Sequence, residues 1–174
     1  MTKQLKNFSV LMFFIVVIAD VFAIISNNET MEMIAKPLLM TTLVVVYLFA
    51  VKKPNIWFVF GLFFSFLGDV FLLFSGGNFF TFGLASFLLA HVVYIKITVD
   101  FLPKINSLKA VSSSIPFVLV FAGLFYLIYD NLGAMLLPVT IYGVTISTFG
   151  AVALLNYRAE KSTENLWLFL GAIL

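Results

Sequence analysis

Two ionisable side chains stand inside apolar stretches of this chain, where charged groups are rare. Asp69 lies in the stretch that begins at Ile56, and His91 lies in the next one, which begins at Phe79. A carboxyl group can donate or accept a proton, and an imidazole can do the same or orient water. An ionisable group at membrane depth is costly, and so by default it indicates a functional site. Asp69 and His91 are therefore the candidate catalytic residues.

The composition identifies the class of protein that must position these groups. Of the 174 residues, 63% are hydrophobic and only 10% are charged, and the mean hydropathy is +1.14. A soluble domain would be about 45–50% apolar and about 25% charged. The chain has too few polar residues to cover the surface of a water-soluble protein. We therefore predict an all-α, polytopic transmembrane helical bundle that forms a single domain. The chain has no cysteine, which excludes disulfides and thiolate nucleophiles.

Other chemistries lack their sequence signatures. One histidine and scattered carboxylates do not have the spacing of a metal site such as His-Glu-x-x-His. We find no P-loop, dinucleotide fingerprint or nucleophile elbow. We therefore expect no metal, no cofactor and no nucleic-acid partner.

Six stretches are long enough to cross a membrane, since a span needs about 20 mostly apolar residues. A seventh is incomplete, because its nine residues rise only about 13 Å. We therefore expect the sequence to be a fragment of a longer protein. The predicted spans are about 8–26, 34–51, 56–74, 79–99, 111–129, 133–155 and, incomplete, 166–174.

The charges predict the orientation. Nine of the ten Lys and Arg residues fall on one side of these spans, which the positive-inside rule makes cytoplasmic. The N-terminus is then cytoplasmic, and the expected location is the bacterial inner membrane. Lys36 is the exception, near the outer end of its span.

Three glycines predict close packing of two spans. Gly61, Gly68 and Gly83 would let the third and fourth spans approach closely.

The estimated depth of each polar residue in the membrane predicts which of them lie at the same level. At about 1.5 Å per residue, Asp20, Lys36 and Asp69 lie about 18, 22 and 20 Å from the inner side, and His91 lies about 12 Å from it. Three of these groups therefore share a layer in the outer half. Asp20 is a possible second carboxylate beside Asp69.

Neighbouring polar side chains extend this site. Ser65 shares a helix face with Asp69, and Tyr94 shares one with His91. Tyr142 lies on one face of the sixth span with Pro138, which we expect to loosen that helix. The substrate-binding candidates are Lys36, Ser65, Tyr94 and Tyr142.

Each group also has a purely structural interpretation. Asp69 could bridge helices, and His91 could be a core histidine hydrogen-bonded to a neighbour. Lys36 could extend to the outer interface as an anchor, and Asp20 could pair with it.

Three blocks of residues follow one another along the second, third and fourth predicted spans. They are Lys36-Pro37-Leu38, Gly61-(x3)-Ser65-(x2)-Gly68-Asp69 and Gly83-(x3)-Phe87-(x3)-His91-(x2)-Tyr94. Together they resemble the lysoplasmalogenase family, the YhhN-type membrane proteins, and the resemblance covers about residues 33–174. It implies an eight-span helical protein that continues, after a pair like Gly171-Ala172, with a Ser-Asp pair that this chain lacks. Asp20 is not part of the family pattern.

The resemblance implies hydrolysis of the vinyl ether bond of a lysoplasmalogen, which gives a fatty aldehyde and a glycerophospho-base. A vinyl ether reacts when its β-carbon is protonated, and a carboxyl pair can supply the proton and stabilise the cation that forms. Asp69 would be one member of that pair, and the other would be the family's late acid or Asp20. His91 would orient water, and Lys36 would hold the lipid phosphate.

Two other classes remain open. A proton-coupled or small-molecule transporter also places acids, histidine and lysine at membrane depth. A non-catalytic lipid-binding protein would use the same residues only for stability. The expected partners are a lysophospholipid substrate and membrane lipids, and the oligomeric state stays open.

Overall fold

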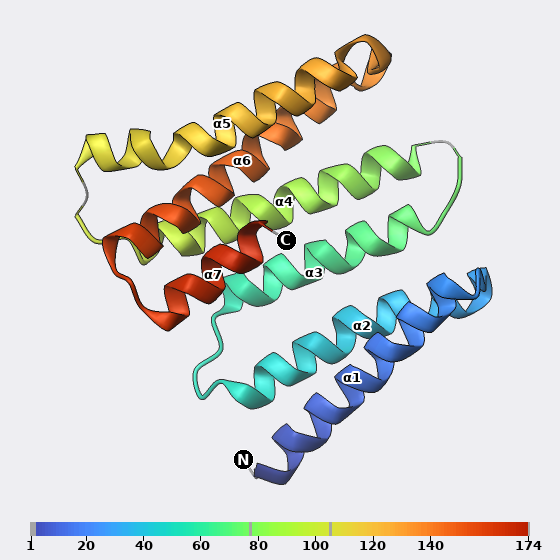
Figure 1. The fold of residues 1–174 in the computed structure, drawn as a ribbon. Helices are drawn as coiled ribbons and strands as arrows, with labels where there is room; N and C mark the ends of the chain where they lie inside the picture. The colour runs from blue at the N-terminus through green and yellow to red at the C-terminus, as the bar shows by residue number, and fades with distance from the viewer. Residues whose placement is uncertain (1–2, 77, 105, 174) are drawn as a thin grey trace. The chain divides into compact units, whose positions relative to one another are not determined.

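The chain is helical throughout the part that the structure describes, which is residues 3–76, 78–104 and 106–173 of a computed structural model. Within these residues there are seven α-helices, two short 3-10 helices and no β-strand (Figure 1). The predicted all-α class is confirmed. The α-helices are α1 (Lys3–Ile25), α2 (Glu29–Ala50), α3 (Ile56–Leu72), α4 (Phe79–Asp100), α5 (Ser107–Ile128), α6 (Leu136–Ala159) and α7 (Thr163–Ile173), and the 3-10 helices are Tyr129–Asn131 and Gly133–Met135.

The helices carry their apolar side chains on the outside. Five of the described segments are long and apolar enough to cross a membrane: α1, α2, α4, α5 with the following 3-10 turn, and α6 with the preceding one. Helix α3 is equally apolar but has only 17 residues. Large side chains such as Ile18 and Leu119 are 68% and 66% exposed. Such a surface is stable only in an apolar solvent, so the fold is that of an integral membrane protein.

Several helices begin a few residues before the predicted apolar stretches, and most other ends agree within three residues. Helix α1 begins at Lys3 rather than Phe8, and α2 begins at Glu29 rather than Ile34. Asn28 caps α2, since its side chain accepts a hydrogen bond from Met31 N at 3.0 Å. Hydropathy marks only the part of a helix that lies in hydrocarbon, whereas backbone hydrogen bonding continues through the polar flanks. Gly77, in the predicted loop 75–78, lies outside the described residues. So does Leu174, at the end of the predicted seventh span 166–174.

One expectation about the sixth span is wrong. Pro138 was expected to loosen the helix, but α6 begins at Leu136 and continues to Ala159. Pro138 therefore lies in the first turn, where its missing N–H has no intrahelical partner to lose. Pro37 and Pro116 lie deeper within their helices, in α2 and α5.

The contacts of the chain group into two compact units, and each is described by itself. The N-terminal unit is Met1–Ala90, and the C-terminal unit is His91–Leu174. In the N-terminal unit α1 packs on α2 and α2 packs on α3, and each helix turns back at a short loop (Figure 1). In the C-terminal unit α5 packs on α6, and α6 packs on α7. The prediction of a single domain stays a prediction.

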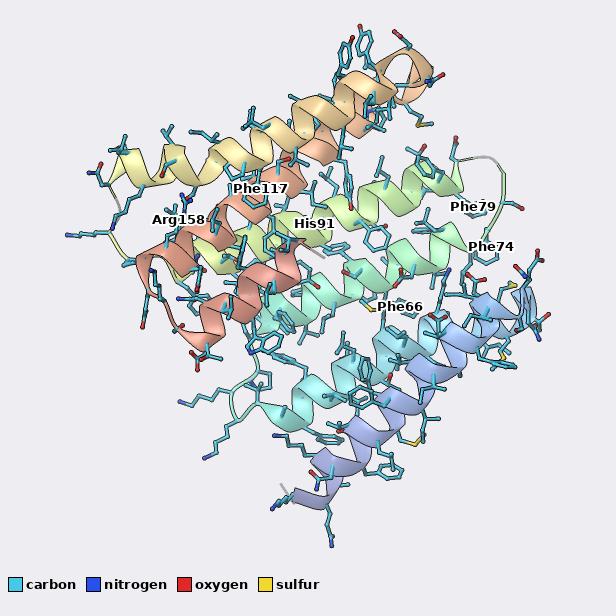
Figure 2. The ribbon with its side chains drawn as sticks, viewed as in Figure 1. Phe66, Phe74, Phe79, His91, Phe117 and Arg158 are labelled. Atoms are coloured by element: carbon cyan, nitrogen blue, oxygen red, sulfur yellow. The ribbon has the colours of Figure 1, made fainter. Side chains whose placement is uncertain are left out.

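Glycines allow α3 and the beginning of α4 to pack closely, as the sequence predicted. A Cβ atom on Gly68 would lie 2.7 Å from the ring of Phe87, and one on Gly83 would lie 2.8 Å from Leu72. At the connection between these helices, Phe74 and Phe79 face each other with ring centroids 5.3 Å apart (Figure 2). This crossing fixes the backbone of α3 next to Asp69.

A buried amide joins the helices of the C-terminal unit. Asn156 on α6 is 2% exposed, and its Nδ2 donates to Thr98 O of α4 at 3.0 Å and to Val152 O at 3.1 Å. A buried polar group is tolerated only with such partners. The bond to Thr98 therefore fixes α6 against the end of α4.

Candidate functional site

Asp69 is the centre of a group of charged side chains in the N-terminal unit. It is half-buried on α3, directly after Gly68. Lys36 on α2 and Asp20 on α1 both lie close enough to act electrostatically on its carboxyl group. Three helices therefore bring together the three residues that the depth estimate placed in one layer. We call Asp20, Glu32, Lys36 and Asp69 the Asp69 cluster.

Lys36 has a carboxylate partner that the sequence analysis missed. Its ammonium group forms an ion pair with Glu32, one turn earlier on α2. The two side chains are 35% and 28% exposed, so the pair lies at the edge of the cluster rather than in its interior. The i, i+4 spacing of Glu32 and Lys36 was the signal that could have predicted this pair. Lys36 therefore adds one positive charge to the cluster and Glu32 adds a third carboxyl group.

Asp20 has an unusual environment for a carboxyl group. Its Oδ1 atom is buried and has no hydrogen-bond partner among the described residues. An unsatisfied buried oxygen costs about 1–3 kcal/mol, and such atoms are uncommon in native proteins. This oxygen is therefore suited to receive a proton or a donor group from a ligand.

Ser65 adds a hydroxyl group one turn before Asp69. Ser65 is buried, with 9% of its surface exposed. Residues spaced i, i+4 lie on one helix face, so Ser65 and Asp69 face the same way. The helix thus places Ser65 on the face of α3 that carries Asp69, and its role in binding stays a prediction.

His91 lies among aromatic rings in the C-terminal unit (Figure 2). Its ring centroid is 6.4 Å from that of Tyr94, 5.6 Å from Tyr142 and 5.8 Å from Phe149, and all three contacts are edge-on. Tyr94 and Phe149 also pack against each other at 6.1 Å. We call these four residues the His91 cluster. The structure thus brings together the three predicted residues His91, Tyr94 and Tyr142.

Phe149 is the member of this cluster that the sequence analysis missed. It follows Tyr142 by seven residues, which is two helical turns, so both side chains lie on one face of α6. Among 22 phenylalanines, this spacing was the only signal available. Edge-on packing of aromatic rings fixes the orientation of the His91 imidazole.

Tyr142 also lines an apolar groove in the C-terminal unit. The groove has a volume of about 500 Å³, within the usual range of small-molecule sites. Aromatic side chains of α5, among them Phe117 and Phe125, form one wall, and Val139 and Ile146 of α6 form the other. The groove therefore offers a mostly apolar surface with Tyr142 in its lining.

The comparison with known families covers most of the chain. The model of the YhhN family, which is the lysoplasmalogenase family, matches residues 31–174. The chain belongs to the YhhN family. No curated protein and no solved structure matches this YhhN chain. The matched range includes Lys36, Asp69 and His91, whereas Asp20 lies before it.

Proposed function

We propose that the chain is a membrane-embedded hydrolase that cleaves the vinyl ether bond of lysoplasmalogens. Membership of the YhhN family supports a reaction of this class. The observation that carries the proposal is the Asp69 cluster, in which two carboxyl groups, Asp20 and Asp69, approach each other within apolar helices. A vinyl ether is inert to ordinary nucleophiles but is opened by acid, so paired carboxyl groups match the chemistry.

The reaction adds one water molecule across the vinyl ether. A carboxylic acid gives its proton to the β-carbon, and the remaining oxocarbenium ion is stabilised by the second carboxylate. Water attacks the cationic carbon and loses a proton to that carboxylate. The hemiacetal then collapses to a fatty aldehyde, and the glycerol oxygen leaves as a hydroxyl group.

We assign the proton donor to Asp69 and the second carboxylate to Asp20. The buried, unpartnered Oδ1 of Asp20 supports this role, because such an oxygen is free to stabilise a cation or to activate water. Lys36, with Glu32 as its partner, would attract the phosphate of the lipid, and Ser65 would donate a hydrogen bond to it. His91 would orient water or a head-group oxygen, with Tyr94 and Tyr142 supporting its ring.

The membrane topology belongs to the same proposal. We assign six crossings to α1–α6, which includes the shorter α3, with the N-terminus in the cytoplasm of a bacterial cell. A 17-residue helix rises about 25 Å, which a slightly thinned bilayer accommodates. The positive charges in the alternate loops support this orientation. The Asp69 cluster then lies toward the outer leaflet.

The test is aldehyde release by the purified chain in detergent. A lysoplasmalogen is the substrate. The lysolipid with a saturated ether is the substrate control, since it has no carbon–carbon double bond that an acid could protonate. Asp69→Asn keeps the size of the side chain but removes the acid, and Asp130→Asn is the matched control at an exposed acid outside the cluster. We expect release only from the vinyl ether, lost in Asp69→Asn and retained in Asp130→Asn.

Other outcomes would support the rival classes. Full activity of a folded Asp69→Asn protein would exclude Asp69 as the donor. No aldehyde from a folded, lipid-binding protein would contradict the hydrolase, and proton-coupled flux in vesicles would then indicate a transporter. Loss of stability without any turnover or flux would indicate a non-catalytic lipid-binding protein.

A further inference from the structure

Arg158 forms an unusual polar group at the end of a membrane-spanning helix. It lies in the last turn of α6, and its Nη1 donates to Ser113 Oγ at 3.3 Å and to Ser112 Oγ at 3.4 Å, both on α5 (Figure 2). Ser113 is fully buried, whereas Arg158 is exposed. Two serine hydroxyls therefore hold one edge of the guanidinium and leave the rest facing outward.

Arg158 forms no ion pair with a carboxylate among the described residues. In the described residues the ion pairs are Lys36 with Glu32 and Lys96 with Asp100, and neither includes Arg158. A guanidinium has five N–H donors in a planar fork, and the two serines accept only from Nη1. The Nε and Nη2 groups then form the two-pronged donor that binds phosphate oxygens in a bidentate way.

An apolar cavity lies beside this charged group. It has a volume of about 260 Å³ between α5 and α6. Leu155, one turn before Arg158, lines it, and so do Ala110 and Ser114, which flank the serine pair on α5. Phe117 forms its wall farther from Arg158 (Figure 2). A cationic group thus lies next to a cavity whose lining is mostly apolar, with hydroxyl groups from Ser114, Ser147 and Thr148.

We propose that Arg158, Ser112 and Ser113, with this cavity, bind an anionic phospholipid of the surrounding membrane leaflet. The phosphate of the head group lies on the guanidinium fork, and the first part of one acyl chain enters the cavity. A free phosphate ion would use the cation but not the apolar hollow, so a lipid fits both features. The site shares no residue with the Asp69 cluster or the His91 cluster, and it does not depend on the proposed hydrolysis.

The experiment measures stabilisation of the purified chain in detergent by added lipid. Melting temperature is recorded against the concentration of phosphatidylglycerol, with phosphatidylcholine and inorganic phosphate as separate ligands. Arg158→Gln removes the cation, and Lys161→Gln removes a cation three residues later as the matched control. We expect phosphatidylglycerol to stabilise the unmodified chain and Lys161→Gln equally. Its apparent affinity should fall about ten- to hundredfold in Arg158→Gln, the usual effect of losing hydrogen bonds to a charged group.

A second variant keeps the test decisive if Arg158→Gln does not fold. Ser114→Leu fills the cavity and leaves the guanidinium and its two serine partners unchanged. It should weaken the binding of phosphatidylglycerol without changing the response to inorganic phosphate. Equal stabilisation by phosphatidylcholine, an unchanged affinity in Arg158→Gln or Ser114→Leu, or an equal effect of inorganic phosphate would overturn the proposal.

Discussion

The substitution Gly68→Ala tests the helix crossing that positions Asp69. The added Cβ would lie 2.7 to 2.8 Å from three ring carbons of Phe87, whereas an ordinary contact begins at 3.4 Å. The ring must therefore move by the difference between 3.4 and 2.7 Å, about 0.7 Å. Overpacking of this kind typically costs about 1–3 kcal/mol. Alanine also gains up to about 1 kcal/mol in helix propensity over glycine, and this gain must be separated from the clash.

Gly123→Ala is the control that separates the two effects. Gly123 lies in α5, and a Cβ there would meet nothing within 4 Å. Both substitutions gain the same helix propensity, so the difference between them measures the clash alone. At about 2–4 °C per kcal/mol for a chain of this size, Gly68→Ala should melt about 2–12 °C below Gly123→Ala. Thermal unfolding in detergent, followed by size-exclusion chromatography of the heated samples, measures this difference.

A compensating substitution identifies the atoms that clash. Phe87→Leu replaces the ring with a smaller, more flexible side chain, so it should restore part of the stability that Gly68→Ala loses. The reasoning would be refuted if Gly68→Ala were as stable as Gly123→Ala, or if Phe87→Leu lowered the stability of Gly68→Ala by its full single-mutant effect. Either result would mean that α3 and α4 do not cross at these two residues.

Three further predictions concern the polar groups. Tyr142→Phe keeps the ring beside His91, so stability should not change. If the phenol donates a hydrogen bond to the substrate, as proposed for a substrate-binding residue, aldehyde release should slow about tenfold, and an unchanged rate would exclude this role. Glu32→Gln should change the stability by less than about 1 kcal/mol in a denaturant titration, because its pair with Lys36 is about a third exposed, and a larger loss would mean that the pair is more strongly coupled. Asn156→Leu should destabilise the chain by about 1–3 kcal/mol because it leaves a buried carbonyl unpaired, and a melting temperature equal to that of the unmodified chain would contradict this.

The sequence predicted the helices well because hydropathy and helical structure have the same cause. Backbone groups in hydrocarbon must bond within the segment, so an apolar run of about 20 residues is necessarily a helix. The ends were less accurate for the same reason. Lys3 and Glu29 lie in polar flanks, where hydropathy gives no signal and capping by residues such as Asn28 decides where a helix begins.

The candidate residues were predictable where they share one helix and hard to predict where two helices meet. The ion pair of Glu32 with Lys36 follows from helical periodicity alone. So does the shared helix face from which Tyr142 and Phe149 both contact His91. The contact between Arg158 and Ser113 joins residues 45 positions apart, and nothing in their local sequence links them. The estimate of membrane depth from residue number is the intermediate case. It placed Asp20, Lys36 and Asp69 in one layer, but it could not show which helices pack next to one another.

The charges of the Asp69 cluster bear on which class of protein this is. Lys36 has Glu32 as its nearest partner, so its single positive charge does not satisfy Asp20 and Asp69 by direct contact. A structural acid in an apolar bundle would be expected to have both oxygens hydrogen-bonded, as buried polar groups usually do. The Oδ1 of Asp20 departs from that rule among the described residues. Burying more carboxyl groups than cations, one of them without a hydrogen-bond partner, lowers the stability of a protein that has only a structural role. An enzyme that uses one carboxyl group as an acid and another as a base on the same bond requires such a pair.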